Sequence, residues 1–231
     1  MARSGEDRPA GARAEVRQLV RDALRAVPGG RMPVSGATRS MAPFLRGGDE
    51  IVWRRAEGVP RVGDVVLFFR DAPARPDASL ADRLRDGGLT VHRVIARRRD
   101  GRLVTKGDGL PGADARPPAR SDLLGLVVAV VRRGRRYALD GAGARLYARV
   151  AAGVSRCGAL LFGAATRVDA VAARVVPALG GRWLLRRPAW WLQRAVQGGW
   201  YLAGFRALHP RGEEAVPPPP RSASEDIPGE R

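Results

Sequence analysis

The hydrophobic periodicity changes twice along the chain, and these changes constrain the fold more than any other feature. Residues 13–30 begin with apolar side chains at helical spacing, and Pro28-Gly29-Gly30 ends the pattern. Residues 31–136 instead contain short apolar runs separated by turns, which is typical of β-strands. Residues 137–208 return to a helical period. We therefore predict a mainly β domain at 31–136, preceded by a helix and followed by a helical extension.

Within the β domain, one run and one dipeptide are especially informative. Val65–Phe69 is unbroken in its apolar character, as expected of a strand buried on both faces. Asp100-Gly101 is the dipeptide that favours a type I′ hairpin. Residues 71–88 resemble an inserted loop with a short helix at 79–86. The predicted strands lie near 31–36, 50–54, 64–70, 89–97, 102–106 and 123–133.

The chain is strongly basic, with a formal net charge of +18 over 231 residues. Of its 41 basic residues, Lys106 is the only lysine. Such an arginine bias is typical of an overall compositional preference, so we do not interpret the charge as a nucleic-acid signal. It does indicate attraction to an anionic surface.

The ends of the sequence and its apolar runs bear on localisation. Residues 1–12 and the Pro-rich segment 209–231 are polar, and we predict that both are disordered. The first 20 residues contain no apolar core of a secretory signal. The charge-free runs 157–166 and 195–205 are shorter than the ~20 residues that a membrane-spanning helix needs. We expect a cytoplasmic or peripherally membrane-associated protein. The single cysteine, Cys157, excludes a disulfide within the chain and is expected to be buried.

The segment 137–208 alternates apolar residues with arginine and is rich in tryptophan. Two interpretations stay open. Basic amphipathic helices with tryptophan are typical of peripheral contact with a membrane surface. Alternatively, the segment is a helical hairpin that covers the β domain, with arginine stems lying along apolar surface.

Four residues with catalytic chemistry lie at predicted strand ends or in loops of the β domain: Ser40, His92, Asp108 and Asp114. A serine nucleophile needs a base within hydrogen-bond reach, and the base works better when a carboxylate orients it. Residue types alone make this a weak signal, because such side chains occur in most proteins.

Five motifs in order make the signal more specific. They are "SGATRSMAPFLRGGDEI" (35–51), "RVGDVVLFF" (61–69), "VHRVI" (91–95), "TKGDGLPGAD" (105–114) and "LLGLVVAV" (123–130). With this order and spacing, residues 31–131 resemble the S24/S26 serine peptidases, the superfamily of type I signal peptidases and self-cleaving repressors. The resemblance is greatest to the branch, typical of endoplasmic-reticulum and archaeal signal peptidases, that uses histidine where the usual bacterial enzyme uses lysine.

The resemblance implies a role for each residue. Ser40 matches the nucleophile, His92 the general base and Asp114 the third member of the triad. Asp108 matches the other acidic position of the same motif and is the second choice. Thr38 and the backbone N–H of Ser40 match the donors of an oxyanion hole. Arg39 departs from the family pattern, which has glycine or another small residue before the serine.

A histidine base also fits elementary acid–base chemistry. A lysine base must lose about 3 pKa units by burial, roughly 4 kcal/mol. Histidine begins near pKa ~6.5 and needs almost no shift. The resemblance therefore implies a serine endopeptidase that cleaves extended peptides after small residues, as in signal-peptide processing, through an acyl-enzyme and without cofactor or metal. The alternative is a catalytically inactive basic β module that binds an anionic membrane or nucleic acid.

Overall fold

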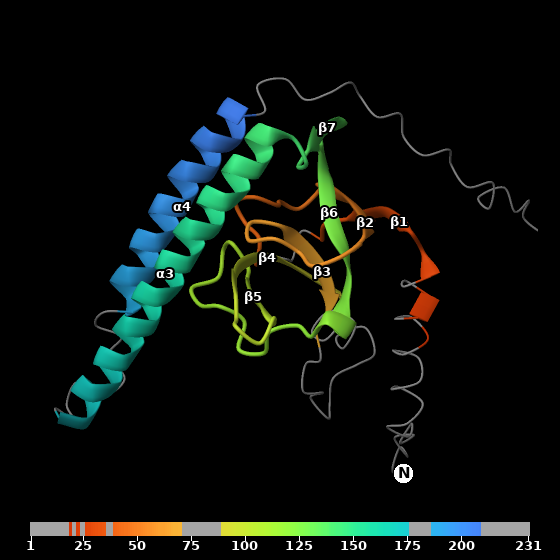
Figure 1. Ribbon diagram of the computed structural model, residues 1–231. Helices are drawn as coiled ribbons and strands as arrows, with labels where there is room; N and C mark the ends of the chain where they lie inside the picture. Colours follow the sequence, from red (N-terminus) through yellow and green to blue (C-terminus); the bar gives the residue numbers. More distant parts are fainter. Residues whose placement is uncertain are drawn as a thin grey trace, which may run out of the picture.

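The computed structural model describes residues 19, 22–23, 26–35, 39–70, 89–175 and 186–208. The strands of these ranges form one antiparallel sheet in the order β1-β2-β6-β3-β4-β5, with β7 pairing to β6 (Figure 1). Their bounds are β1 Gly29–Pro33, β2 Glu50–Arg55, β3 Val65–Phe69, β4 Leu89–Arg97, β5 Leu103–Lys106, β6 Leu123–Arg132 and β7 Arg135–Ala138. The predicted β domain thus has the expected strands and one additional strand, β7.

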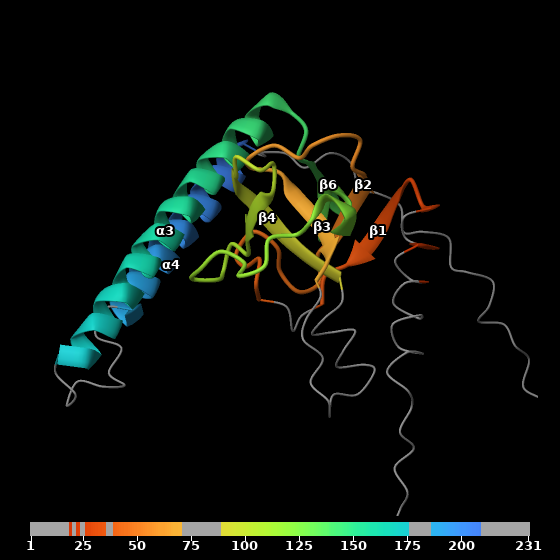
Figure 2. The same ribbon diagram turned by 60° about the horizontal axis from the view of Figure 1, so that its bottom comes forward.

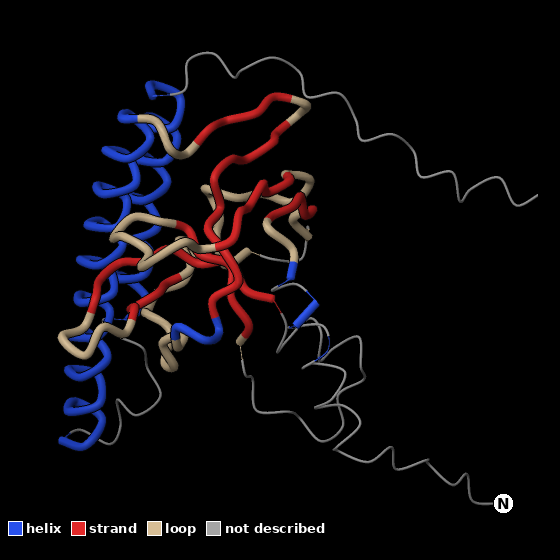
Figure 3. Tube along the Cα trace, turned by 45° about the vertical axis from the view of Figure 1, so that its right-hand side comes forward, coloured by secondary structure: helices blue, strands red, loops and turns tan. Residues whose placement is uncertain are grey.

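Two long helices follow the sheet, α3 at Ala142–Val175 and α4 at Arg186–Leu208. They lie side by side against one side of the strands (Figures 1 and 3). The fold is therefore mainly antiparallel β with a C-terminal helical hairpin. Of the predicted N-terminal helix, residues 19, 22, 23 and 26 are helical, and β1 already begins at Gly29. The predictions for 1–12, 71–88 and 209–231 lie outside the described residues.

Strand β3 is buried on both faces, as its unbroken apolar run predicted. Val65 and Leu67 belong to the main core cluster, whereas Val66 and Phe68 belong to a second cluster that includes Val94. Successive side chains of a strand point to opposite faces, so this division between two clusters follows directly from the strand period. The prediction is confirmed, and β3 forms the wall between the two clusters.

The turn at Asp100-Gly101 connects β4 to β5, but its predicted type is wrong. In a type I′ turn both central residues have positive φ. Only Gly101 does, with φ of 82°, and its N–H donates to Arg98 O at 3.0 Å. This is the pattern of a type I turn followed by a left-handed glycine. The two positive φ values of type I′ occur instead at Arg133 and Gly134, in the tight β6–β7 hairpin.

The helical hairpin packs against the turn at 39–45. Tyr147 of α3 and Tyr201 of α4 belong to the main core cluster together with Met41 and Phe44. The ring centroids of Tyr147 and Tyr201 lie 5.8 Å apart, and both are within 6.4 Å of the Phe44 ring. One of the two interpretations of segment 137–208, that it covers the β domain, is thus confirmed for the buried face of the helices. Neither described helix combines the length and apolarity needed to cross a bilayer. Cys157 is exposed on α3, so the expectation of a buried thiol was wrong.

Candidate active site

Ser40 lies at the start of a turn that is anchored on both sides. Met41 and Phe44 are buried in the main core, at 2% and 3% exposure. On the other side, Arg132 of β6 donates to Phe44 O at 2.8 Å and forms an ion pair with the buried Asp49 at 2.6 Å. The two apolar anchors and the buried ion pair hold the half-buried Ser40 next to the sheet. The buried positions of Met41 and Phe44 explain why apolar residues follow the serine in its sequence motif.

His92 and Asp114 form a buried pair beside this turn. His92, in the middle of β4, places Nδ1 2.7 Å from Asp114 Oδ2. Asp114 also accepts from Thr105 Oγ1 at 2.7 Å and from Arg70 Nη2 at 2.6 Å, and its own N–H donates to Thr105 O at 2.8 Å. The backbone bond ties the loop to β5. The carboxylate therefore orients the imidazole, as the sequence-based assignment of Asp114 requires.

The charge state of Asp114 follows from these contacts. Burial alone raises the pKa of the carboxyl group. The hydrogen bond from His92 and the contacts with Thr105 and Arg70 outweigh burial, so the pKa of Asp114 lies below its ordinary value. An ionised carboxylate only accepts hydrogen bonds, so the proton of the His92 ring is on Nδ1. Nε2 is then the nitrogen that can take a proton.

Gly107 lies directly against both Ser40 and His92. A Cβ at Gly107 would lie 2.5 Å from Ser40 O and 3.0 Å from His92 Nε2, so the chain passes directly against both residues. Gly109 is packed in the same way against Arg39 O and Ala42 O, and its N–H donates to Ser40 O at 2.7 Å. Only glycine permits so close a backbone approach. Within the described residues there is no direct hydrogen bond between Ser40 Oγ and the His92 ring.

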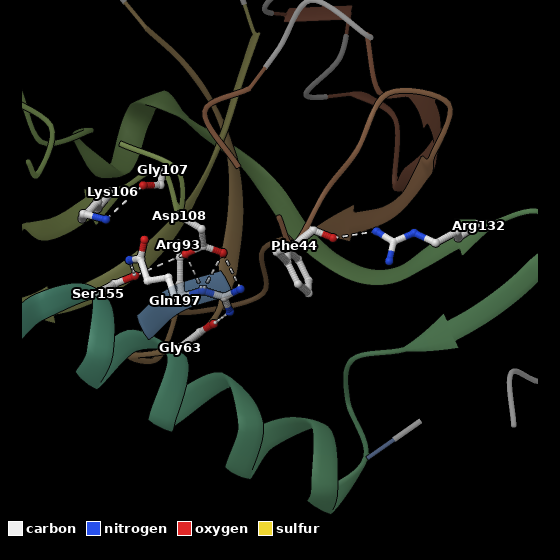
Figure 4. Close-up of polar contacts among 9 residues, drawn as sticks. All are labelled: Phe44, Gly63, Arg93, Lys106, Gly107, Asp108, Arg132, Ser155 and Gln197. Carbon is white, nitrogen blue, oxygen red and sulfur yellow. Dashed lines mark hydrogen bonds and ion pairs between the residues drawn. The ribbon is translucent and has the colours of Figure 1, made fainter. Parts of the chain in front are cut away.

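Asp108, the second choice for the triad acid, is committed to a different partner. It forms a bidentate pair with Arg93, with Nη2 at 2.8 Å from Oδ2 and Nε at 3.0 Å from Oδ1. Figure 4 shows this pair together with Gly63 O, which accepts from Arg93 Nη1 at 3.0 Å. Burial lowers the pKa of Arg93, but the charge and hydrogen bonds of Asp108 together with the nearby Tyr201 and Tyr147 outweigh it, so the pKa is raised and the guanidinium stays ionised. The structure brings Asp114, and not Asp108, to His92.

Two polar side chains of the helical hairpin contact the 107–110 loop, and a third supports one of them. Ser155 of α3 donates to Asp108 Oδ1 at 3.4 Å, and Gln197 of α4 donates to Ser155 Oγ at 3.2 Å (Figure 4). One helical turn earlier, Gln193 donates to Leu110 O at 3.0 Å. All three side chains are buried. Our sequence analysis missed them, although two glutamines four residues apart on an otherwise apolar and basic helix were a usable signal.

Lys106 is fully buried next to the site. Its ammonium group donates to Gly107 O at 3.2 Å (Figure 4). Burial, helped by the nearby charge of Arg93, lowers the pKa of Lys106 from 10.5 to about 8, against the opposing effect of Asp108 and Asp114. The lysine contacts neither Ser40 nor His92 within the described part of the chain. Its observed role is to hold the loop backbone.

The remaining predicted site elements are located as follows. Thr38 lies outside the described residues. The Ser40 N–H donates to no described residue. Arg39 is exposed. No group of three metal-ligating side chains occurs in the described ranges. A hollow lined by Phe44, Gly63, Arg93 and Tyr147 lies elsewhere and does not include Ser40, His92 or Asp114. The candidate site is therefore defined by the contacts among its side chains and not by this hollow.

Comparison with protein-family models, with curated proteins and with solved structures gave no match to the chain. The functional assignment therefore depends on the geometry of these residues and on the sequence motifs that contain them.

Proposed function

We propose that the chain is a serine endopeptidase of the S24/S26 type, with Ser40 as nucleophile, His92 as general base and Asp114 as the orienting acid. The observation that carries the proposal is the buried His92–Asp114 pair, at 2.7 Å, whose Nε2 lies against the same glycine as the backbone oxygen of Ser40. The ordered sequence motifs support the same assignment.

The chemistry follows from the roles of these atoms. Ser40 Oγ attacks the carbonyl carbon of an extended peptide while His92 Nε2 accepts its proton. The oxygen of the tetrahedral intermediate carries the negative charge, and the Ser40 N–H and Thr38 are the proposed donors to it. The imidazolium then protonates the departing amine, which leaves an acyl-enzyme. Water, deprotonated by His92, releases the acid and restores Ser40. Asp114 keeps Nδ1 protonated throughout.

Within the described residues Ser40 Oγ forms no hydrogen bond with the His92 ring, which fits a site that tightens around substrate. Catalytic hydrogen bonds are often long or poorly aligned in unliganded enzymes. The base typically contributes about 10²–10⁴-fold to the rate, and one oxyanion donor about 10²–10³-fold. Loss of either the nucleophile or the base should therefore be easy to measure.

The test is a library of peptides with small residues at the cleaved position, incubated with wild type, Ser40→Ala and His92→Ala. A matched control is Ser121→Ala, because Ser121 is an exposed serine outside the site. We expect turnover by wild type and the control only. Equal hydrolysis by wild type and Ser40→Ala would exclude the proposal.

Within the described residues, Ser40 Oγ forms no direct hydrogen bond with the His92 ring. This observation favours a second candidate function, a non-catalytic basic β module. This alternative predicts no hydrolysis of any peptide by the wild-type chain. It also predicts binding to nucleic acid or anionic membrane that weakens steeply with salt.

A further inference from the structure

Helix α3 carries an exposed apolar stripe on the side that faces away from the β domain. Its five large apolar members are each more than half exposed: Leu146, Leu160, Leu161, Val168 and Val171. At 3.6 residues per turn, they fall within about 100° of the helix circumference. The buried Ala144, Ala151 and Ser155 fall about 130–170° from the centre of the stripe, on the opposite side of the helix. Among the described residues, nothing covers this stripe, which forms a second face of α3.

A row of arginines borders this stripe along the same helix. All five arginines of α3 are exposed, and none forms an ion pair with a described residue: Arg145, Arg149, Arg156, Arg167 and Arg174. By the same helical geometry they fall within about 40° of one another and adjoin one edge of the apolar stripe. The only acidic residue of α3, Asp169, is buried on the opposite face. The exposed face of α3 thus combines apolar side chains with positive charge alone.

Helix α4 also exposes both apolar and basic side chains. Trp191, Leu192 and Val196 are each more than half exposed, and Arg194 places its guanidinium 5.4 Å from the Trp190 ring centroid. The two helices together contain nine arginines and one acidic residue. Figure 2 shows that the end of the hairpin formed by the last turns of α3 extends past the sheet. The apolar and basic side chains near that end are therefore accessible to an extended surface.

We propose that the outer face of α3 binds an anionic phospholipid surface, with the helix lying in the interface plane. The apolar stripe would enter the boundary between headgroups and acyl chains, and the arginines would extend to the phosphates. Charge complementarity favours this partner over a second copy of the chain, because each copy would present only positive charge to the other. A nucleic acid would neutralise the arginines and leave the leucines in water. The proposal is independent of peptidase activity.

The experiment measures binding of the full chain to vesicles of phosphatidylglycerol and phosphatidylcholine, against vesicles of phosphatidylcholine alone. Three variants are compared. One removes charge from the row (Arg156→Gln, Arg167→Gln, Arg174→Gln). A second removes the stripe (Leu160→Gln, Leu161→Gln, Val168→Gln). The matched control removes the same charge from exposed arginines at the end of β4 (Arg97→Gln, Arg98→Gln, Arg99→Gln). All substituted side chains are exposed, and far-UV circular dichroism checks that each variant is folded.

We expect wild type to bind anionic vesicles and not neutral ones. Each basic residue near such a surface contributes roughly fivefold in affinity, so the charge variant should bind about 100-fold more weakly. The stripe variant should lose at least about tenfold, because its apolar area no longer enters the interface. The control should stay within about threefold, because charges more than a Debye length from the membrane are screened.

Three results would each overturn the proposal. The first is equal affinity for neutral and anionic vesicles, or no affinity for either. The second is anionic binding that the stripe variant retains in full, which would indicate a simple polyanion site. The third is a concentration-dependent dimer in sedimentation velocity that the stripe variant abolishes, which would assign the face to a second copy.

Discussion

Asp108 and Asp114 lie six residues apart in one loop. The structure predicts that changing Asp108 to asparagine mainly affects stability, whereas changing Asp114 to asparagine mainly affects catalysis. Asp108 balances Arg93, a guanidinium with 1% side-chain exposure. Removing one partner of a buried ion pair costs about 3–5 kcal/mol, because the other charge is left uncompensated. Asparagine keeps one acceptor, so we expect Asp108→Asn to lower the free energy of unfolding by about 3 kcal/mol. The folded fraction should keep a normal His92–Asp114 pair.

Asp114→Asn should instead affect catalysis more than folding. The Arg70 side chain, its cationic partner, is 38% exposed and can turn to water. Thr105 can still donate to the amide oxygen, so we expect a loss of only about 1–2 kcal/mol in the free energy of unfolding. An amide in place of the carboxylate fixes the wrong tautomer of the histidine, an effect of about 10⁴-fold in a well-known Ser-His-Asp peptidase. We expect kcat/KM to fall about 10³–10⁴-fold.

The pH dependence of stability gives the Asp114 variant a second signature. A carboxyl group whose pKa is lowered in the folded state contributes stability that is complete above its unfolded pKa, near ~3.9, and is lost as the pH falls through the folded value. The stability difference between wild type and Asp114→Asn should therefore be largest at neutral pH and shrink below pH ~4.

Urea unfolding at several pH values and steady-state peptide hydrolysis measure both properties on the same preparations. The assignment is refuted if Asp108→Asn is inactive yet as stable as wild type while Asp114→Asn hydrolyses peptide normally. If wild type has no activity, the unfolding data still test whether Asp108 balances the buried arginine.

Three further substitutions test the loop. Lys106→Met should raise the free energy of unfolding by about 2 kcal/mol at pH 7, since a pKa lowered from 10.5 to about 8 corresponds to about 3 kcal/mol, less ~1 for the hydrogen bond to Gly107. Folded Lys106 loses its proton at a lower pH than the unfolded lysine does, so the stability of wild type rises between pH 8 and 10.5. The stability gained by Lys106→Met should therefore shrink over the same range. A gain that does not depend on pH, or a loss of peptidase activity, would contradict this account. Gly107→Ala should reduce kcat/KM at least about 10²-fold, because its Cβ would separate Ser40 from His92, and near-normal turnover would contradict the close approach. Gln193→Leu leaves Leu110 O without its donor and should cost about 1–2 kcal/mol by urea unfolding, whereas an unchanged midpoint would mean that the hairpin does not hold the loop.

The strand positions could be predicted because each depends on local pattern. Val65–Phe69 carries enough apolar side chains to be buried on both faces, and the structure divides them between two clusters. The β6–β7 hairpin was missed because its central dipeptide is Arg133-Gly134, not the usual Asn-Gly or Asp-Gly, and Arg133 takes a left-handed φ that non-glycine residues rarely adopt.

Residue pairing in the site was less predictable. The motif "TKGDGLPGAD" offers two aspartates, and its spacing does not say which faces His92. A usable signal was nevertheless present in "VHRVI". Since neighbours in a strand point to opposite faces, His92 and Arg93 of a buried strand enter different clusters, and a buried guanidinium requires a buried carboxylate. The contacts from Ser155, Gln193 and Gln197 depend on how the hairpin packs, which the helical period alone does not determine.

The alternation of His92 and Arg93 along β4 also relates the hairpin to the site. His92 lies beside Phe68, with ring centroids 6.0 Å apart, on the side of the second core cluster. The Arg93 guanidinium instead lies 4.7 Å from the centroid of the Phe44 ring, on the side of the helices. The loop that supplies a carboxylate to each therefore contacts both faces of the strand. A displacement of the hairpin that moved Asp108 would act on the same ten-residue segment, 105–114, that holds Asp114 against the histidine. If the outer face of α3 binds a membrane, its orientation there bears directly on the loop that aligns the imidazole, and the effect of anionic vesicles on peptide hydrolysis would measure that connection.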